Sequence, residues 1–173
     1  MATMQEQNGT VCDKTVTHAQ NGIKATISNM THFAMTLDRS HSWSGIPANP
    51  FPETIPPNSK VILTHLNENY FGSKGVVVYT GRNAVGMDCS WVLAWHALAD
   101  NKSPPNRVHV LCGPKKFIDR LSFDEIQEAI DDLDNALPSN TFTDQATKTY
   151  ADGNIDDLVP TFATLIADFK LVR

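Results

Sequence analysis

The feature that most constrains the fold is a series of short segments in which apolar and polar residues alternate one by one. Alternation with a period of two places one face of a strand on a core and the other in water. Glycine and proline separate these segments, as is typical of turns. The sequence therefore predicts a mainly β protein, an antiparallel β-sandwich. The predicted strands are residues 23–29, 33–38, 60–65, 75–80, 89–98 and 107–112.

Three other segments are harder to assign. Residues 40–57 contain five of the ten prolines, and proline cannot donate to a strand ladder, so this stretch is expected to be loop or sheet edge. Residues 141–154 are polar and are interpreted as loop. Residues 158–172 fit either a strand or a helix, and we favour a closing strand because β-branched residues are frequent there.

One segment has the chemistry of a helix. Ser122 and Glu125 form a capping-box pattern, in which the hydroxyl and the carboxylate satisfy free amides at a helix start. Apolar residues then recur at helical spacing through positions 123, 126, 130 and 133. Pro138 marks the end. The sequence predicts a single amphipathic helix over about 122–136, inserted into the sandwich.

The length and the net charge of the chain limit the classes of protein to which it can belong. A chain of 173 residues suits one domain, expected at 22–173, after a polar and flexible N-terminal arm at 1–21. The formal net charge of −5 argues against nucleic acid as a partner. Since the N-terminus lacks the apolar core of a secretory signal and no apolar run is long enough for a bilayer, a cytoplasmic location without transmembrane insertion is expected. Oligomerisation stays open.

Cysteines and acidic residues give no metal or redox motif. Cys12, Cys89 and Cys112 are odd in number and match no disulfide or zinc spacing, and the last two lie in apolar segments, so they are expected to be buried thiols. Residues 152–157 resemble a calcium loop, but the glycine is misplaced and Ala163 stands where a bidentate glutamate should fall. We expect no metal and no cofactor, and we find no catalytic motif.

The aromatic residues are the most informative candidates for a ligand-binding surface. Trp91 and Trp95 share one face of a predicted strand, which is typical of a core. Trp43 lies in a polar, proline-rich segment, and Tyr70 and Phe71 precede a glycine as a similar exposed pair. Exposed loop aromatics suit contact with a ligand, a glycan or a membrane interface. For Trp43, a ligand contact and a role in covering the sandwich both stay open.

Several motifs together resemble a known family. These are SHSWSG at 40–45, FP at 51–52 at the end of the proline-rich stretch, GVVVYTG at 75–81 and CSWVLAW at 89–95. In order and spacing they resemble the small jasmonate-induced proteins of plants, over roughly residues 23–113. More distantly, the layout is similar to the actinoporin-like sandwiches, which include sea-anemone pore-forming proteins and the mushroom lipid-binding protein nakanori.

The resemblance implies a β-sandwich flanked by a helix, and binding to a lipid headgroup in plant stress or defence. Two departures limit what carries over. The N-terminal arm is polar, whereas the anemone proteins have an amphipathic helix there, so pore formation is not expected. Trp95-His96-Ala97 stands where their phosphocholine site has a Ser-x-Pro step, so that headgroup site is not preserved residue by residue.

The sequence thus predicts a non-enzymatic binding module for a lipid headgroup or a carbohydrate, in which aromatic faces stack on a sugar or attract a choline. One alternative is a small-molecule enzyme with His41 or His96 as general acid or base, supported by Asp38 or Asp88. Another is a protein–protein module that uses the acidic outer face of the helix. The predicted ligand-binding residues are His41, Trp43, Tyr70, Phe71, Tyr79, Trp95 and His96.

Overall fold

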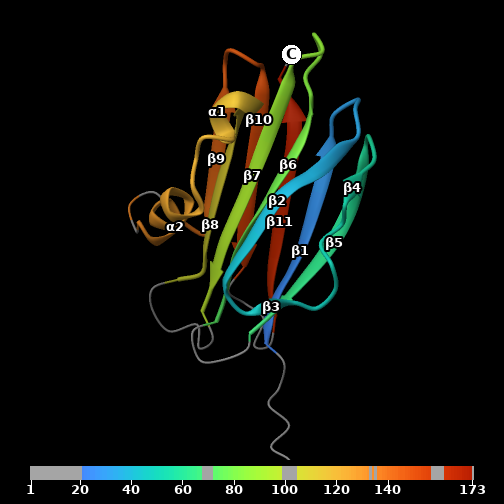
Figure 1. The fold of residues 1–173 in the computed structure, drawn as a ribbon. Helices are drawn as coiled ribbons and strands as arrows, with labels where there is room; N and C mark the ends of the chain where they lie inside the picture. Colours follow the sequence, from blue (N-terminus) through green and yellow to red (C-terminus); the bar gives the residue numbers. More distant parts are fainter. Residues whose placement is uncertain are drawn as a thin grey trace, which may run out of the picture.

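The computed structural model is a sandwich of two β-sheets with two helices packed on one outer face (Figure 1). It describes residues 21–67, 72–98, 105–132, 134, 136–156 and 162–172. Sheet A has the strand order β3-β5-β1-β11-β10-β9 and sheet B the order β4-β2-β6-β7-β8. The elements are β1 (Gly22–Met30), β2 (Met35–Ser44), β3 (Ile46–Pro47), β4 (Thr54–Ile55), β5 (Ser59–Leu66), β6 (Ser73–Arg82), β7 (Asp88–Ala97), β8 (Arg107–Pro114), α1 (Lys115–Ile118), α2 (Phe123–Asp131), β9 (Ser139–Asp144), β10 (Thr149–Asp156) and β11 (Phe162–Leu171).

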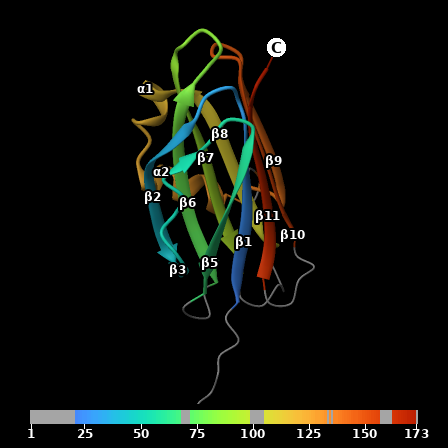
Figure 2. The same ribbon diagram turned by 90° about the vertical axis from the view of Figure 1, so that its right-hand side faces the viewer.

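The predicted two-sheet sandwich is confirmed, and the predicted closing strand is β11. This strand enters the centre of sheet A and lies parallel to β1, with Ala25 opposite Leu165 (Figure 2). The β1–β11 pair is thus a parallel pair within the predicted antiparallel sandwich. The reason is topological: the first and last strands of the sandwich are neighbours and run in the same direction, while the other ladders of the described residues are antiparallel.

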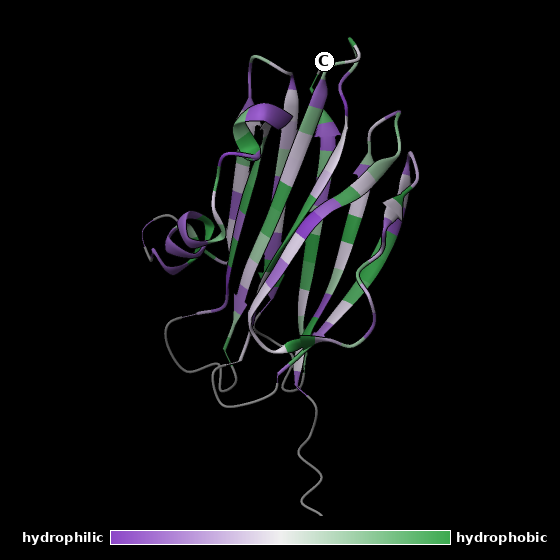
Figure 3. Cartoon of the chain, viewed as in Figure 1, coloured by the Kyte–Doolittle hydropathy of each residue, from purple (hydrophilic) through white to green (hydrophobic). Residues whose placement is uncertain are grey.

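The alternating side chains meet between the sheets. Tyr79, Trp91 and Trp95 from sheet B face Ile23 and Phe169 from sheet A, and all five are fully buried. Figure 3 shows the resulting alternation of hydrophobic and hydrophilic positions along the strands. The predicted buried thiols are confirmed, because Cys89 and Cys112 lie free in this core. Burial of so much aromatic and aliphatic surface is the main source of stability.

Two segments differ from prediction. In the proline-rich stretch 40–57, β2 continues to Ser44, so position 43 lies in a strand; the rest supplies the two-residue edge strands β3 and β4, as the edge interpretation requires. The loop interpretation of 141–154 is wrong, because β9 and β10 form a hairpin there. Its inward positions include Thr149, Ala151 and Gly153, whose small or polar side chains hide the alternation.

The predicted helix is present, but it ends at Asp131 rather than near 136, and a second short helix, α1, precedes it. The predicted capping box is confirmed: Ser122 Oγ accepts from the amide of Glu125, whose carboxylate accepts from the amide of Ser122. Ile126 and Ile130 of α2 pack on Val92 and Ala94 of sheet B, so the helices cover part of its outer face. Neither helix is long and apolar enough to cross a bilayer.

Candidate functional site

Two of the predicted site residues, His41 and Trp43, project from β2 onto the outer face of sheet B beside α2. The ring of His41 stacks on that of Phe123 with 4.9 Å between centroids and meets the indole of Trp43 edge-on at 5.4 Å. The ammonium of Lys74 lies 5.6 Å from the centroid of the same indole. Trp43 is therefore half-buried against the apolar cluster under α2, in a strand rather than in the loop expected at this position.

An ionic cluster borders this indole. Lys74 Nζ lies 2.6 Å from both carboxylate oxygens of Asp131, the last residue of α2. The guanidinium of Arg107 donates to Nδ1 of His96 at 2.7 Å. Because that nitrogen accepts a hydrogen bond, His96 is neutral and forms no true ion pair with Asp131, although the two lie 3.5 Å apart. Burial, and then the charges of Arg107 and Lys74, lower the pKa of His96 to about 4.

Two other predicted site residues face the opposite way. Tyr79 and Trp95 point into the sandwich and are fully buried, so the prediction that they share a surface with Trp43 is wrong. Neighbouring residues of a strand point to opposite faces, which separates Trp95 from His96. The Tyr79 hydroxyl donates to the carbonyl of Pro52 at 2.8 Å, and burial raises its pKa to about 12. Tyr70 and Phe71 lie outside the described residues.

The interior also holds a hydrogen-bonded chain that the sequence analysis missed. His65 is fully buried, with Nε2 2.9 Å from Ser42 Oγ and Nδ1 2.8 Å from Ser73 Oγ. Trp95 Nε1 donates to Ser73 Oγ at 3.0 Å. Phe51 stacks on the imidazole with 6.2 Å between centroids. A histidine at an inward position of an alternating strand was the available signal, because such a side chain must be paired when it is buried.

This hydrogen-bonded chain bears on whether His65, a residue that the enzyme alternative based on His41 or His96 did not name, could act as a base. An indole N–H can only donate, so Ser73 Oγ accepts from Trp95, and it shares a second hydrogen bond with Nδ1 of His65. Both ring nitrogens of His65 are thus engaged with serine hydroxyls, and neither contacts a carboxylate. The two carboxylates suggested as partners for a catalytic histidine are paired otherwise: Asp38 with Lys115 and Asp88 with Arg82.

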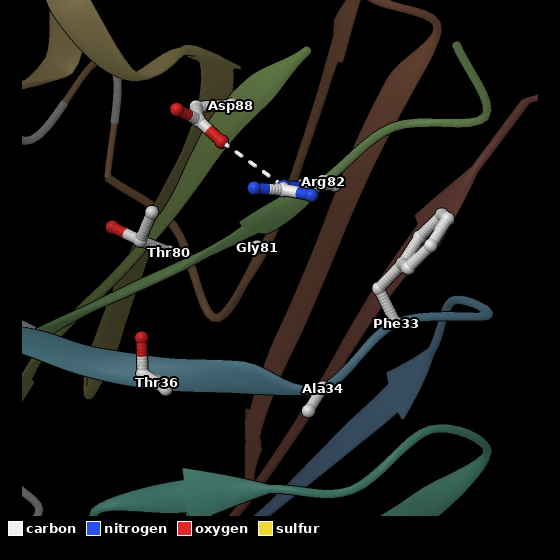
Figure 4. Close-up of a pocket in the computed structure, with 7 residues that line it drawn as sticks. All are labelled: Phe33, Ala34, Thr36, Thr80, Gly81, Arg82 and Asp88. Atoms are coloured by element: carbon white, nitrogen blue, oxygen red, sulfur yellow. Dashed lines mark ion pairs between the residues drawn. The ribbon is translucent and has the colours of Figure 1, made fainter. Parts of the chain in front are cut away.

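A separate concavity of about 340 Å³ lies on the uncovered part of the outer face of sheet B. Figure 4 shows the side chains of Arg82 and Asp88 turned toward each other, Phe33 on the turn between β1 and β2, and Thr36 and Thr80 on adjacent strands. We call it the Arg82 pocket. The Arg82–Asp88 pair is 3.4 Å long, and its side chains are 63% and 65% exposed. Exposed pairs of this kind are weak, so both groups are available to a ligand.

Apolar side chains project from the turns beside this pocket. Phe33, from the turn between β1 and β2, is 39% exposed. Val85 and Met87, from the turn between β6 and β7, are 83% and 46% exposed. Both turns border the Arg82 pocket, since Phe33, Arg82 and Asp88 line it. A polar pocket is thus flanked by exposed apolar side chains from two turns.

Sequence comparison finds a relative over most of the chain. A jasmonate-induced protein homolog of Atriplex canescens is 36% identical over 156 residues, which span 88% of this chain and 82% of that protein. No family model matches the sequence. The aligned region is longer than residues 23–113, the segment that carries the resemblance described above.

Structural comparison finds sandwiches of the same fold. The lipid-binding protein Nakanori superposes with a TM-score of 0.69 at 15% identity, covering 86% of this chain and 71% of Nakanori. The Xerocomus chrysenteron lectin XCL superposes with a TM-score of 0.52 at 11% identity, covering 86% of this chain and 99% of the lectin. At such low identity these likenesses establish the shared fold alone.

Proposed function

The chain belongs to the jasmonate-induced protein family, and we propose that it is a binding module that recognises a zwitterionic lipid headgroup at a membrane surface. The Arg82 pocket is the proposed site. The observation that carries the proposal is the combination, in one concavity, of a guanidinium, a carboxylate and a phenyl ring beside exposed apolar turns. A role in plant stress or defence is part of the same proposal.

The groups of the pocket match a phosphate joined to a quaternary amine. A guanidinium binds phosphate oxygens through paired, charge-assisted hydrogen bonds, which is the role of Arg82. Asp88 attracts the positively charged end of the headgroup, and the ring of Phe33 adds cation–π attraction. In binding, the headgroup replaces an exposed ion pair whose own strength is small, so little stabilisation is lost.

Charge and apolar exposure favour a zwitterionic membrane over an anionic one. The net charge of −5 gives the chain no general attraction to anionic lipid. Val85 and Met87, exposed on the turn beside the pocket, are suited to shallow contact with the boundary between headgroups and acyl chains. No deep insertion is needed for this mode of binding.

The test is sedimentation with vesicles of phosphatidylcholine, with and without competing phosphocholine. Arg82→Ala and Phe33→Ala should each weaken binding at least tenfold, because each removes a contact to one end of the headgroup. Arg120→Ala is the matched control, since it removes an exposed guanidinium that does not line the pocket. Wild-type binding in both pocket variants would refute the site. Signal on a glycan array that is lost in Arg82→Ala, with no vesicle binding, would replace the headgroup by a carbohydrate.

The surface formed by His41, Trp43 and His96 stays a separate prediction of ligand contact. Two contacts support the covering role: the ring of His41 stacks on Phe123 of α2, and Trp43 packs on the apolar cluster beneath that helix. Trp43→Ala distinguishes the two roles. We expect it to reduce stability while vesicle binding at a temperature well below unfolding is retained; lost binding in a folded variant would move the ligand site to this surface.

A further inference from the structure

A second pocket, on the opposite sheet, contains a buried hydroxyl with no partner. Ser28 of β1 is 2% exposed, and its Oγ makes no hydrogen bond to any part of the chain that the structure describes. The residue lines a pocket of about 290 Å³ on the outer face of sheet A, which we call the Ser28 pocket. A buried hydroxyl without a partner is unfavourable, so the position is one that a ligand or solvent hydroxyl must satisfy.

Opposite charges stand on either side of this hydroxyl. In the sheet register Ser28 lies directly between Lys60 of β5 and Asp168 of β11, and both line the pocket. Neighbouring strands are ~4.8 Å apart, so the backbones of Lys60 and Asp168 are roughly 10 Å apart, on the two sides of the same opening. Lys60 is exposed and Asp168 half-buried. The pocket therefore offers cationic donors, a hydroxyl and carboxylate acceptors in one row.

The charged side chains of this row disfavour ligands that are only anionic or only cationic. Asp152 of β10 lies directly opposite Asp168, so a second carboxylate borders the acidic side and disfavours an anion. Lys60 disfavours a cation on the other side. A neutral molecule with several hydroxyls suits both, because a carboxylate accepts from two adjacent hydroxyls while an ammonium and a serine donate. Met30, 50% exposed, adds an apolar wall for the C–H face of a ring.

The geometry points to a carbohydrate subsite at Ser28, Lys60 and Asp168, independent of the Arg82 pocket. Its ligand class is a neutral monosaccharide, free or at the end of a glycan. The volume is just below the ~300–1,000 Å³ typical of pockets for drug-sized ligands, which fits one sugar ring rather than a chain. The aliphatic part of Met30 would cover the ring, Asp168 would accept from adjacent hydroxyls, and Ser28 would complete its missing hydrogen bond.

The experiment is titration of the 15N-labelled full chain with glucose, galactose, mannose and N-acetylglucosamine, followed by amide chemical shifts. At least one sugar should shift the amides of Ser28, Lys60 and Asp168 in a saturable way. Ser28→Ala and Asp168→Asn should each reduce the affinity at least fivefold. Ser139→Ala and Asp124→Asn are matched controls outside the pocket and should bind as wild type does.

A weaker sugar response in Ser28→Ala cannot be attributed to loss of folding. Ser28→Ala removes a hydroxyl that has no partner among the described residues, so its Tm should equal or exceed that of the wild type. Shifts that saturate equally in Ser28→Ala and the wild type would overturn the proposal, as would no shift with any of the four sugars. The Arg82→Ala variant should keep the sugar response, which separates failure here from failure of the proposed headgroup site.

Discussion

The imidazole of His65 lies 2.9 Å from the hydroxyl of Ser42, inside the sandwich and covered by Phe51. This arrangement resembles a nucleophile next to its base, yet the histidine is held neutral and is oriented by Ser73 rather than by a carboxylate. Burial lowers the pKa of His65 to about 4. The clearest consequence of this lowered pKa is for the stability of the protein rather than for catalysis.

Stability should fall as the solution is acidified. The pKa of His65 is about 4 in the folded chain and 6.5 when unperturbed, so between these values the unfolded chain binds more protons. The free energy of unfolding therefore has its full value above pH 6.5 and decreases as the pH falls toward 4. The decrease is on the order of 3 kcal/mol for a pKa shift of this size. His96, with a pKa also lowered to about 4, adds to the same trend.

Urea unfolding at a series of pH values measures this dependence. His65→Gln keeps a donor and an acceptor but does not titrate, so its slope between pH 4 and 6.5 should be smaller than that of the wild type. His32→Gln, at an exposed position, is the control and should leave the slope unchanged. An equal slope in His65→Gln would show that the buried imidazole is not responsible.

The core thiols should be unreactive while the protein is folded. Burial raises the pKa of Cys89 to about 11 and also raises that of Cys112, and only the thiolate attacks a disulfide reagent. With an aromatic disulfide reagent at neutral pH, two of the three thiols should react only after denaturant is added. Rapid reaction of all three in the native protein would contradict the packing around these residues.

Gly75 should tolerate no side chain. A Cβ built at this position would lie 2.6 Å from Cζ2 of Trp95, and the indole is fixed by its bond to Ser73. Gly75→Ala is expected to lower the free energy of unfolding by about 1–3 kcal/mol through overpacking. Gly81→Ala is the comparison, since its Cβ would meet the flexible side chain of Met35 at 3.2 Å and should cost less. Chemical denaturation followed by tryptophan fluorescence reports both, and equal stability would refute the close fit.

The capping box should contribute to stability through α2. Ser122→Ala removes the acceptor for the amide of Glu125 and is expected to cost about 1 kcal/mol. Ser122→Gly should cost only a few tenths, because glycine is itself tolerated at a helix start. Chemical denaturation of the two variants, with Ser139→Ala as an exposed-strand control, gives the comparison. Identical losses for alanine and glycine would mean that the hydroxyl has a different role.

Much of the candidate surface could not be inferred from local pattern. Alternation separates Trp95 from His96 onto opposite faces, and the shared face of Trp91 and Trp95 is typical of a core, so the burial of Trp95 was predictable. The pocket lined by Phe33, Arg82 and Asp88 was not predictable, because its residues come from three strands or turns that only folding brings together. Asp131, the ion-pair partner of Lys74, likewise lies on a helix distant in the chain.

The sequence by itself determined the strands with strict alternation, the helix start at Ser122 and the buried thiols, because each depends on neighbours within a few residues. Tertiary structure alone decided that β11 inserts beside β1, that α2 covers Trp43, and that Ser28 is enclosed between Lys60 and Asp168. These arrangements depend on which strands pair and in which register, and pairing is set by the summed packing of both sheets rather than by any local segment.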